Sequence, residues 1–300
     1  MLSNSETLST AVSDTSDLFV PTPAFGNDNP TVSFNLTPVS DYSTQMPFLD
    51  IAKTMRPWIG HEAGKWGGMS IDELEAGGYL DENGWVTEIP EGLDSVGSIW
   101  AWDGSSTSTS SSAVESRAGI YEMTYEGEGE IQLGNATIIS QEDGRIVFEV
   151  VDNKNLTFKI FETDPAGTGD YIRNISVVHE DNIDLHEAGA IFNPDWLELV
   201  ADSRDFRFMF WNSTINSESS SWDERRQVDS ATWFGEVPLE IMVQLANEAG
   251  VDPWFTIPHM ADDEYVREFA TYVRDNLDPS LTVRVEYSNE IWNSIYDETH

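Results

Sequence analysis

The sequence predicts an α/β protein in which a parallel sheet is interrupted by an inserted antiparallel β-sandwich. Strand-like and helix-like segments alternate after residue 193, which is typical of parallel strands joined by helices. Short runs of alternating apolar and polar residues fill the stretch 85–185, and turn residues separate them, as in an antiparallel sandwich. One strand-like and one helix-like segment come before these runs. The antiparallel stretch therefore looks inserted after a first β/α unit.

The first β/α unit is assigned to residues 31–84. Residues 1–30 are polar and of low complexity, which predicts a disordered leader. Thr31–Leu36 alternates between apolar and polar residues and is predicted to be a strand. Phe48–Trp58 has apolar residues at helical spacing, and Pro57 and Gly60 mark the end of a short helix.

Residues 85–185 are assigned to the inserted β-sandwich. Four runs in this stretch alternate clearly and are predicted to be strands: Gly119–Tyr125, Arg145–Val151, Leu156–Phe161 and Tyr171–Val178.

Residues 186–300 are assigned to the rest of the α/β part. Strands two to four of the parallel sheet are predicted at Phe206–Trp211, an apolar run broken only by Arg207, and at Trp254–Pro258 and Val283–Tyr287. Helices are predicted at Asp195–Val200, Pro238–Ala249 and Asp262–Asn276, with Gly250 ending the second and an acidic first turn in the third.

The composition excludes several kinds of partner and chemistry. The chain has 54 acidic and 15 basic residues, a formal charge of −39, so neither nucleic acid nor an anionic membrane is an expected partner. Such a surface suits high salt, where charge repulsion is screened. The chain has no cysteine, which excludes disulfides, thiolate catalysis and cysteine-bound zinc. No apolar run reaches the roughly 18 residues of a membrane span, and the N-terminus lacks the features of a signal peptide.

Polar and aromatic residues follow three of the predicted strands. Asn212 comes after the second, His259 after the third and Glu290 after the fourth. Because the carboxyl ends of parallel strands meet at one edge of a sheet, we expect these residues to lie together. Indole rings stack on sugars, and a carboxyl group in a partly apolar setting can protonate a glycosidic oxygen. The sequence thus predicts Glu290 as the catalytic residue, with substrate-binding residues His259, Trp211 and Trp292, and with no metal or cofactor.

The dipeptide Asn289-Glu290, at the end of the fourth predicted strand, resembles the clan A glycoside hydrolases. The resemblance implies a partial (β/α)8 barrel of about four strands carrying the inserted sandwich. It also implies that Glu290 is the general acid/base and that Asn289 binds the sugar 2-hydroxyl. The longer strings Asp252–His259 and Tyr287–Asn293 are similar to a group of large bacterial proteins described as cellulose-binding or uncharacterised.

The chain departs from the family pattern after the fourth strand. The retaining mechanism needs a second carboxylate about 5 Å from the first, and the family takes it from the seventh strand. A complete barrel typically needs about 250 residues, more than remain outside the insert. We therefore expect an N-terminal fragment that lacks the nucleophile.

Several residues have alternative explanations. His259 either contacts substrate or caps the helix that begins near Asp262, and a metal site at His259 is disfavoured because no distant ligand accompanies it. Trp211 ends an apolar run and fits a core position as well as a sugar platform. If Arg207 is buried it requires an acidic partner, with Glu286 and Glu290 as candidates.

Three functions remain open on the sequence alone. The first is a retaining glycoside hydrolase that acts on a polysaccharide or oligosaccharide. The second is a non-catalytic carbohydrate-binding protein, and the third is a structural segment of an extracellular protein. An extracellular location is expected for each of them, although the N-terminus shows no signal peptide.

Overall fold

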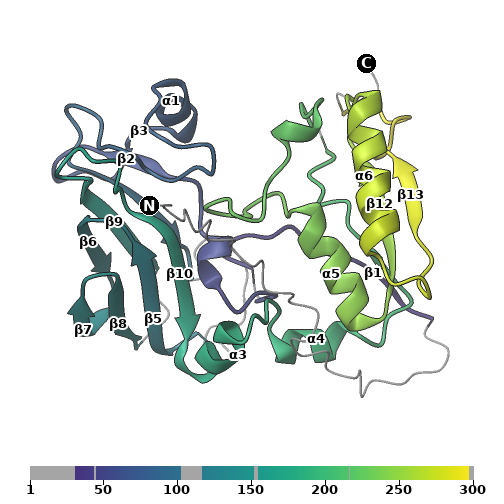
Figure 1. Cartoon of the computed structure of the whole chain (residues 1–300), viewed down its shortest axis with the longest axis horizontal. Coiled ribbons are helices and arrows are strands. Elements are labelled where there is room, and N and C mark those ends of the chain that lie inside the picture. Colours follow the sequence, from purple (N-terminus) through teal and green to yellow (C-terminus); the bar gives the residue numbers. More distant parts are fainter. Residues whose placement is uncertain (1–30, 44, 103–116, 152–154, 216, 297–300) are drawn as a thin grey trace, which may run out of the picture.

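The computed structural model describes residues 31–43, 45–102, 117–151, 155–215 and 217–296. The predicted leader, residues 1–30, lies outside them. The described strands form one parallel sheet and two antiparallel sheets. Figure 1 shows the antiparallel sheets on one side of the molecule and the parallel sheet, with its helices, on the other. Within the described ranges, no helix is both long and apolar enough to cross a membrane.

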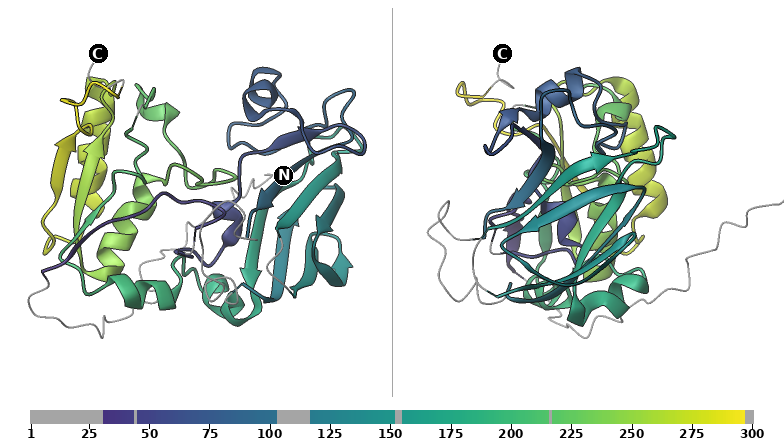
Figure 2. Two further views of the ribbon diagram at one scale, coloured as in Figure 1. Left: turned by 180° about the vertical axis from the view of Figure 1, so that it is seen from behind. Right: turned by 90° about the vertical axis from the view of Figure 1, so that its left-hand side faces the viewer.

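The parallel sheet has four strands in the order β1-β11-β12-β13. Its strands are β1 (Ser33–Asn35), β11 (Asp205–Arg207), β12 (Asp252–Ile257) and β13 (Arg284–Tyr287). Phe206 of β11 pairs with Phe34 on one side and Pro253 on the other, so β11 is an inner strand despite its three residues. Figure 2 shows β13 at the outer edge of this sheet, on the side away from the antiparallel sheets.

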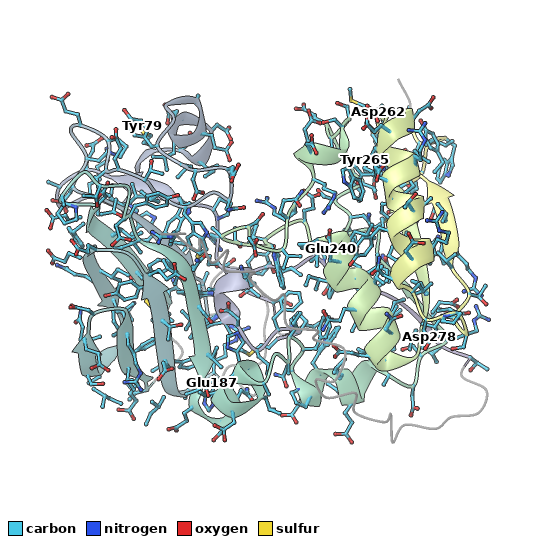
Figure 3. The ribbon with its side chains drawn as sticks, viewed as in Figure 1. Tyr79, Glu187, Glu240, Asp262, Tyr265 and Asp278 are labelled. Atoms are coloured by element: carbon cyan, nitrogen blue, oxygen red, sulfur yellow. The ribbon has the colours of Figure 1, made fainter. Side chains whose placement is uncertain are left out.

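Helices cover one face of the parallel sheet. The longest are α5 (Leu239–Ala249) and α6 (Asp263–Asn276), and the shorter α4 (Pro194–Val200) precedes β11. Asp262 begins α6 by accepting a hydrogen bond from the Tyr265 backbone N–H (2.7 Å), and Asp278 lies beyond its other end (Figure 3). Phe255 of β12 packs edge-on against Phe269 of α6, with ring centroids 5.3 Å apart. Sheet and helices thus share one hydrophobic core.

The two antiparallel sheets pack face to face around a second core. One has the order β10-β5-β8-β7 and the other β3-β2-β4-β9-β6. Their strands are β2 (Ile59–His61), β3 (Gly68–Met69), β4 (Ser95–Trp100), β5 (Gly119–Glu126), β6 (Gly129–Gly134), β7 (Thr137–Glu142), β8 (Arg145–Val150), β9 (Leu156–Thr163) and β10 (Arg173–His179). Buried aromatic residues from both sheets meet in this core, among them Trp100, Tyr121, Phe148 and Phe158.

Short helical segments connect these parts. They are η2 (Ile51–Thr54), α1 (Ile71–Ala76), η3 (Glu180–Asn182), α3 (Ile183–Glu187) and η4 (Trp222–Glu224). In α1, Ser70 and Glu73 form a reciprocal capping box, which explains why six residues form a helix on their own. The segments η3, α3 and α4 lead from the antiparallel sheets to β11, at the bottom of Figure 1.

The predicted partial (β/α)8 barrel is wrong. The parallel strands form an open sheet with edges at β1 and β13, and most strands of the described chain are antiparallel. A barrel places a helix after every strand, but β1 leads into the 3-10 segment η2 and then into the antiparallel sheets. The predicted helix Phe48–Trp58 is reduced to Ile51–Thr54. Strand β2 pairs with β4 on one side and with β3 on the other, so both belong to an antiparallel sheet instead of extending a β/α unit.

Candidate functional site

The carboxyl ends of β11, β12 and β13 lie next to one another. The three strands are parallel neighbours, with Arg207 paired to Trp254 and Ile257 paired to Tyr287. We call the segments that follow these strands, residues 208–212, 258–260 and 288–292, the strand-end rim. All five predicted site residues, Asn289, Glu290, His259, Trp211 and Trp292, belong to this rim, and of these only Trp211 is part of the hydrophobic core of the parallel sheet.

The turn after β13 has a strained backbone. Ser288 and Glu290 have φ angles of 55° and 47°, in the left-handed region that residues other than glycine seldom adopt. Neighbouring groups hold this turn: the Ser288 N–H donates to the Ile257 carbonyl (2.7 Å), and the Asn293 side-chain amide donates to Glu290 Oε2 (2.9 Å). Strain of this kind is kept where the surroundings impose it, often at functional sites.

Arg207 anchors the buried Asn289 to the neighbouring strands. Its Nη2 donates to Glu286 Oε2 (2.8 Å) and to Asn289 Oδ1 (3.1 Å), and its guanidinium lies 5.2 Å from the centroid of the Trp254 ring. The expectation of an acidic partner for Arg207 is confirmed, and the partner is Glu286. The orientation of Asn289, which is 4% exposed, is therefore set by a cation on β11.

Buried polar atoms without a partner recur at all three strand ends. They are Asn212 Oδ1 after β11, His259 Nδ1 after β12 and Ser288 Oγ after β13, none of which has a hydrogen bond to the described residues. A buried polar atom left unpaired costs about 1–3 kcal/mol, and most such atoms in proteins find a partner. Ligand hydroxyl groups or water would satisfy them.

The alternative role of His259 as a helix cap is not realised. Asp262 is the N-cap of α6, and its Oδ1 accepts the hydrogen bond from Tyr265. The His259 carbonyl instead accepts a hydrogen bond from the Tyr287 hydroxyl (2.8 Å), which joins the ends of β12 and β13. In the part of the chain that the structure describes, no group of three or more His, Asp or Glu residues could hold a metal ion.

The two predicted tryptophan platforms lie in different environments. Trp292 is 76% exposed, whereas Trp211 is 1% exposed, stacks on Trp196 and donates from Nε1 to the Thr37 carbonyl. Trp211 thus occupies the core position that the sequence left open as an alternative. Tyr287, which the sequence analysis did not single out, is 61% exposed beside the rim. Its place at the end of an edge strand, one residue before Ser288, is the signal that could have identified it.

The rim and the adjoining Tyr287 combine exposed aromatic rings with hydrogen-bonding groups. Trp292 and Tyr287 have accessible faces, and Glu290, Asn289 and His259 supply a carboxylate, an amide and an imidazole. The other acid of β13, Glu286, is ion-paired to Arg207 and so is not a free second carboxylate for a retaining reaction. This set of groups can bind a polyhydroxylated ring without any bond being broken.

Comparison with protein-family models, with curated proteins and with solved structures finds no match for this chain.

Proposed function

We propose that this protein binds a polysaccharide or oligosaccharide at the strand-end rim. The observation that carries the proposal is the set of unpaired buried polar atoms at the ends of three neighbouring strands, in the same rim as the exposed indole of Trp292. A sugar has hydroxyl groups for the former and apolar ring faces for the latter. Binding of this kind uses Asn289, His259 and Glu290 as hydrogen-bonding groups.

Binding is favoured over hydrolysis because of the charges on β13. A retaining hydrolase needs one carboxylate as the acid and a second as the nucleophile, about 5 Å apart. Glu290 could serve as the acid, but Glu286 faces Arg207, with Nη2 to Oε2 at 2.8 Å. Sugar binding needs only the side chains that the rim already presents.

The test compares two exposed tryptophans. Trp292→Ala should weaken binding of soluble cellulose and xylan oligosaccharides about tenfold, or about 1.4 kcal/mol, because the stacking face is lost. Trp66→Ala is the matched control, since Trp66 is 46% exposed but lies next to His61 in the antiparallel part. Isothermal titration calorimetry measures both variants. Equal affinity of the Trp292 variant and the unmodified protein would contradict the proposal, as would a lack of binding to any oligosaccharide.

Glu290→Gln separates binding from hydrolysis. The amide keeps the shape and one hydrogen-bond acceptor, so affinity should fall by less than about tenfold. An assay for newly released reducing ends should stay at background for both the unmodified protein and this variant. Release by the unmodified protein that the variant abolishes would show that Glu290 is catalytic and that binding alone understates the function.

A further inference from the structure

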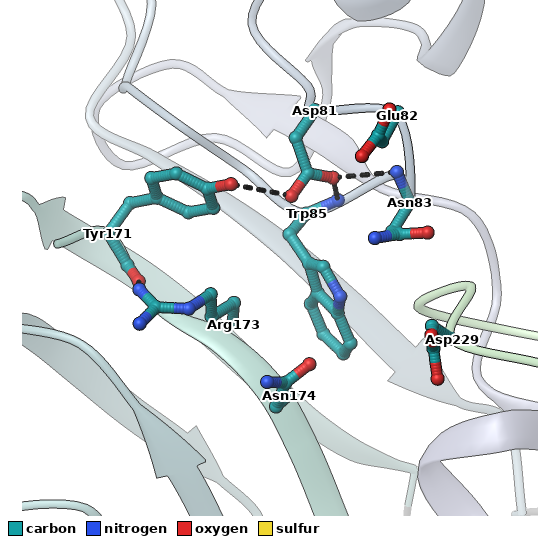
Figure 4. A pocket seen from close by; sticks show the side chains of 8 residues that line it. All are labelled: Asp81, Glu82, Asn83, Trp85, Tyr171, Arg173, Asn174 and Asp229. Carbon is teal, nitrogen blue, oxygen red and sulfur yellow. Dashed lines mark hydrogen bonds between the residues drawn. The ribbon is translucent and has the colours of Figure 1, made fainter. Parts of the chain in front are cut away.

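A cavity lies away from the strand-end rim, where the antiparallel sheets meet the loop that follows η4. It has a volume of about 590 Å³, within the range of roughly 300–1,000 Å³ typical of small-molecule sites. Figure 4 shows its walls, which come from the turn before β4, the start of β10 and the loop around Asp229. We call it the acidic pocket, because Asp81, Glu82 and Asp229 line it together with Trp85 and Tyr171.

The acidic pocket has a preformed wall built around Asp81. One carboxylate oxygen accepts hydrogen bonds from the backbone N–H groups of Asn83 (2.9 Å) and Trp85 (2.8 Å), and the other accepts from the Tyr171 hydroxyl (2.7 Å). The Ala231 N–H donates to the Asn83 carbonyl (2.8 Å), which ties the loop near Asp229 to the same turn. Residues far apart in the sequence are therefore held in place before any ligand arrives.

Trp85 supplies the observation that points to a ligand. Its side chain is 2% exposed, and its Nε1–H has no hydrogen-bond partner among the described residues. In Figure 4 the indole nitrogen lies on the edge of the ring that faces Asn83 and Asp229. An indole N–H can only donate. The ligand must therefore bring an acceptor to this edge of the pocket.

The remaining charges restrict the chemistry of that ligand. Arg173, a cation of the lining, is already ion-paired with Glu126 and Asp170. Glu82 and Asp229 are exposed carboxylates at the pocket and accept hydrogen bonds only. They disfavour an anion, while the Trp85 N–H disfavours a metal cation. A hydroxyl group suits both the indole and the carboxylates, because it can accept a hydrogen bond from the Trp85 N–H and donate one to a carboxylate. We propose that the acidic pocket binds a neutral saccharide, as a second site that does not depend on the strand-end rim.

The test follows the Trp85 side chain directly. Protein labelled with ¹⁵N-tryptophan shows one side-chain N–H resonance for each indole, and Trp85→Phe assigns the Trp85 resonance by its disappearance. Cellulose, xylan, mannan and laminarin oligosaccharides are titrated at millimolar concentration, with calcium chloride as a separate titration. At least one oligosaccharide should shift the Trp85 resonance saturably, and this shift should persist in Trp292→Ala, which removes only the rim platform.

Surface variants provide a test that does not disturb the core. The double variant Glu82→Gln and Asp229→Asn should weaken binding of the saccharide that shifts the Trp85 resonance about tenfold. Glu88 is an exposed acid of the same segment outside the pocket, and Glu88→Gln should leave this affinity unchanged. A Trp85 resonance that no oligosaccharide shifts, or that only calcium shifts, would overturn the proposal. An unchanged affinity in the double variant would do the same.

Discussion

The parallel and antiparallel parts of the molecule differ in how completely their sheets are buried. The two antiparallel sheets bury their inner faces against each other, so Trp100, Phe148 and Phe158 are almost completely buried. The parallel sheet is open, and its edge strand β13 leaves Val285 and Tyr287 61% exposed. One part is a closed scaffold, whereas the other has an accessible edge and accessible strand ends.

This difference explains where the two proposed sites lie. The strand-end rim uses side chains and turns at the ends of parallel strands, where neighbouring strands point their termini the same way. The antiparallel scaffold has no such common end, because adjacent strands alternate in direction. Its pocket is instead formed by loops, with Asp81 joined to Tyr171 across 90 positions of sequence. The following predictions test this contrast.

The largest loss of stability is expected when a side chain of the antiparallel core is truncated. Phe158 is fully buried, with its ring centroid 5.3 Å from that of Trp58 and 5.5 Å from that of Trp100. Phe158→Ala should lower the free energy of unfolding by about 3–5 kcal/mol because it leaves a cavity among rigid rings. Val285→Ala on the exposed edge should change it by less than about 0.5 kcal/mol. Denaturant unfolding measures both, and similar losses would remove the contrast between the two parts.

A smaller loss of stability is expected when Arg207, which anchors Asn289 of the rim, is replaced. Arg207→Gln should lower the free energy of unfolding by about 2 kcal/mol, because Glu286 and the buried Asn289 oxygen lose their donor. The loss is moderated because the Arg207 and Glu286 side chains are 20% and 31% exposed.

Arg274→Gln provides the control for this anchor. Its ion pair with Asp275 is on the surface, with side chains 69% and 53% exposed, so a change below about 0.5 kcal/mol is expected. If the Arg207 variant were as stable as the Arg274 variant, the anchoring role of Arg207 would be refuted.

The third prediction concerns the pH dependence of stability that comes from His61, in the antiparallel part. Burial, with a smaller contribution from the charge of Lys159, lowers the pKa of His61 from 6.5 to about 4. Nδ1 of His61 also accepts a hydrogen bond from the Gly67 N–H (2.9 Å), which protonation would break. Between these two pKa values the unfolded chain binds a proton at this histidine and the folded protein does not. The contribution of neutral His61 to the free energy of unfolding is therefore complete above pH 6.5 and is lost as pH falls toward 4.

Unfolding measured from about pH 7 to about pH 5 should show a loss of about 2 kcal/mol from this histidine. His61→Asn, whose side-chain oxygen can still accept from Gly67, should remove the dependence, while the carboxylates common to both proteins contribute equally. The difference between the two pH profiles of the free energy of unfolding therefore gives the contribution of the His61 imidazole. Parallel profiles would show that His61 is not responsible.

Local patterns predicted many single elements well. Alternation located β8, expected at Arg145–Val151 and found at Arg145–Val150, because its apolar side chains face one core. The acidic start at Asp262 located α6, since a carboxylate caps the first turn. The Asn289-Glu290 dipeptide was correctly expected to follow the last predicted strand, in which Val285 and Tyr287 alternate with Arg284 and Glu286.

Features that depend on distant contacts could not be predicted in the same way. The apolar run Phe206–Trp211 predicted a strand, but β11 ends at Arg207 and the chain turns back, with the Asn212 N–H donating to the Phe208 carbonyl. A buried turn and a buried strand look alike in hydrophobicity. Whether parallel strands close into a barrel depends on their partners and the sheet's curvature, not on the pattern within each strand. The acidic pocket was missed because its walls meet only after folding.

The pairing of β1 with β11 has a consequence for the order in which the molecule assembles. Ser33 donates a hydrogen bond to Asp205 across 172 positions of sequence, and the whole antiparallel part lies between them. During synthesis β1 leaves the ribosome early, yet its neighbour in the sheet is made only after both antiparallel sheets. Those sheets contain hairpins such as β7–β8, which close over short distances and form fast. We therefore expect β1, the first strand that the structure describes, to be among the last to pair.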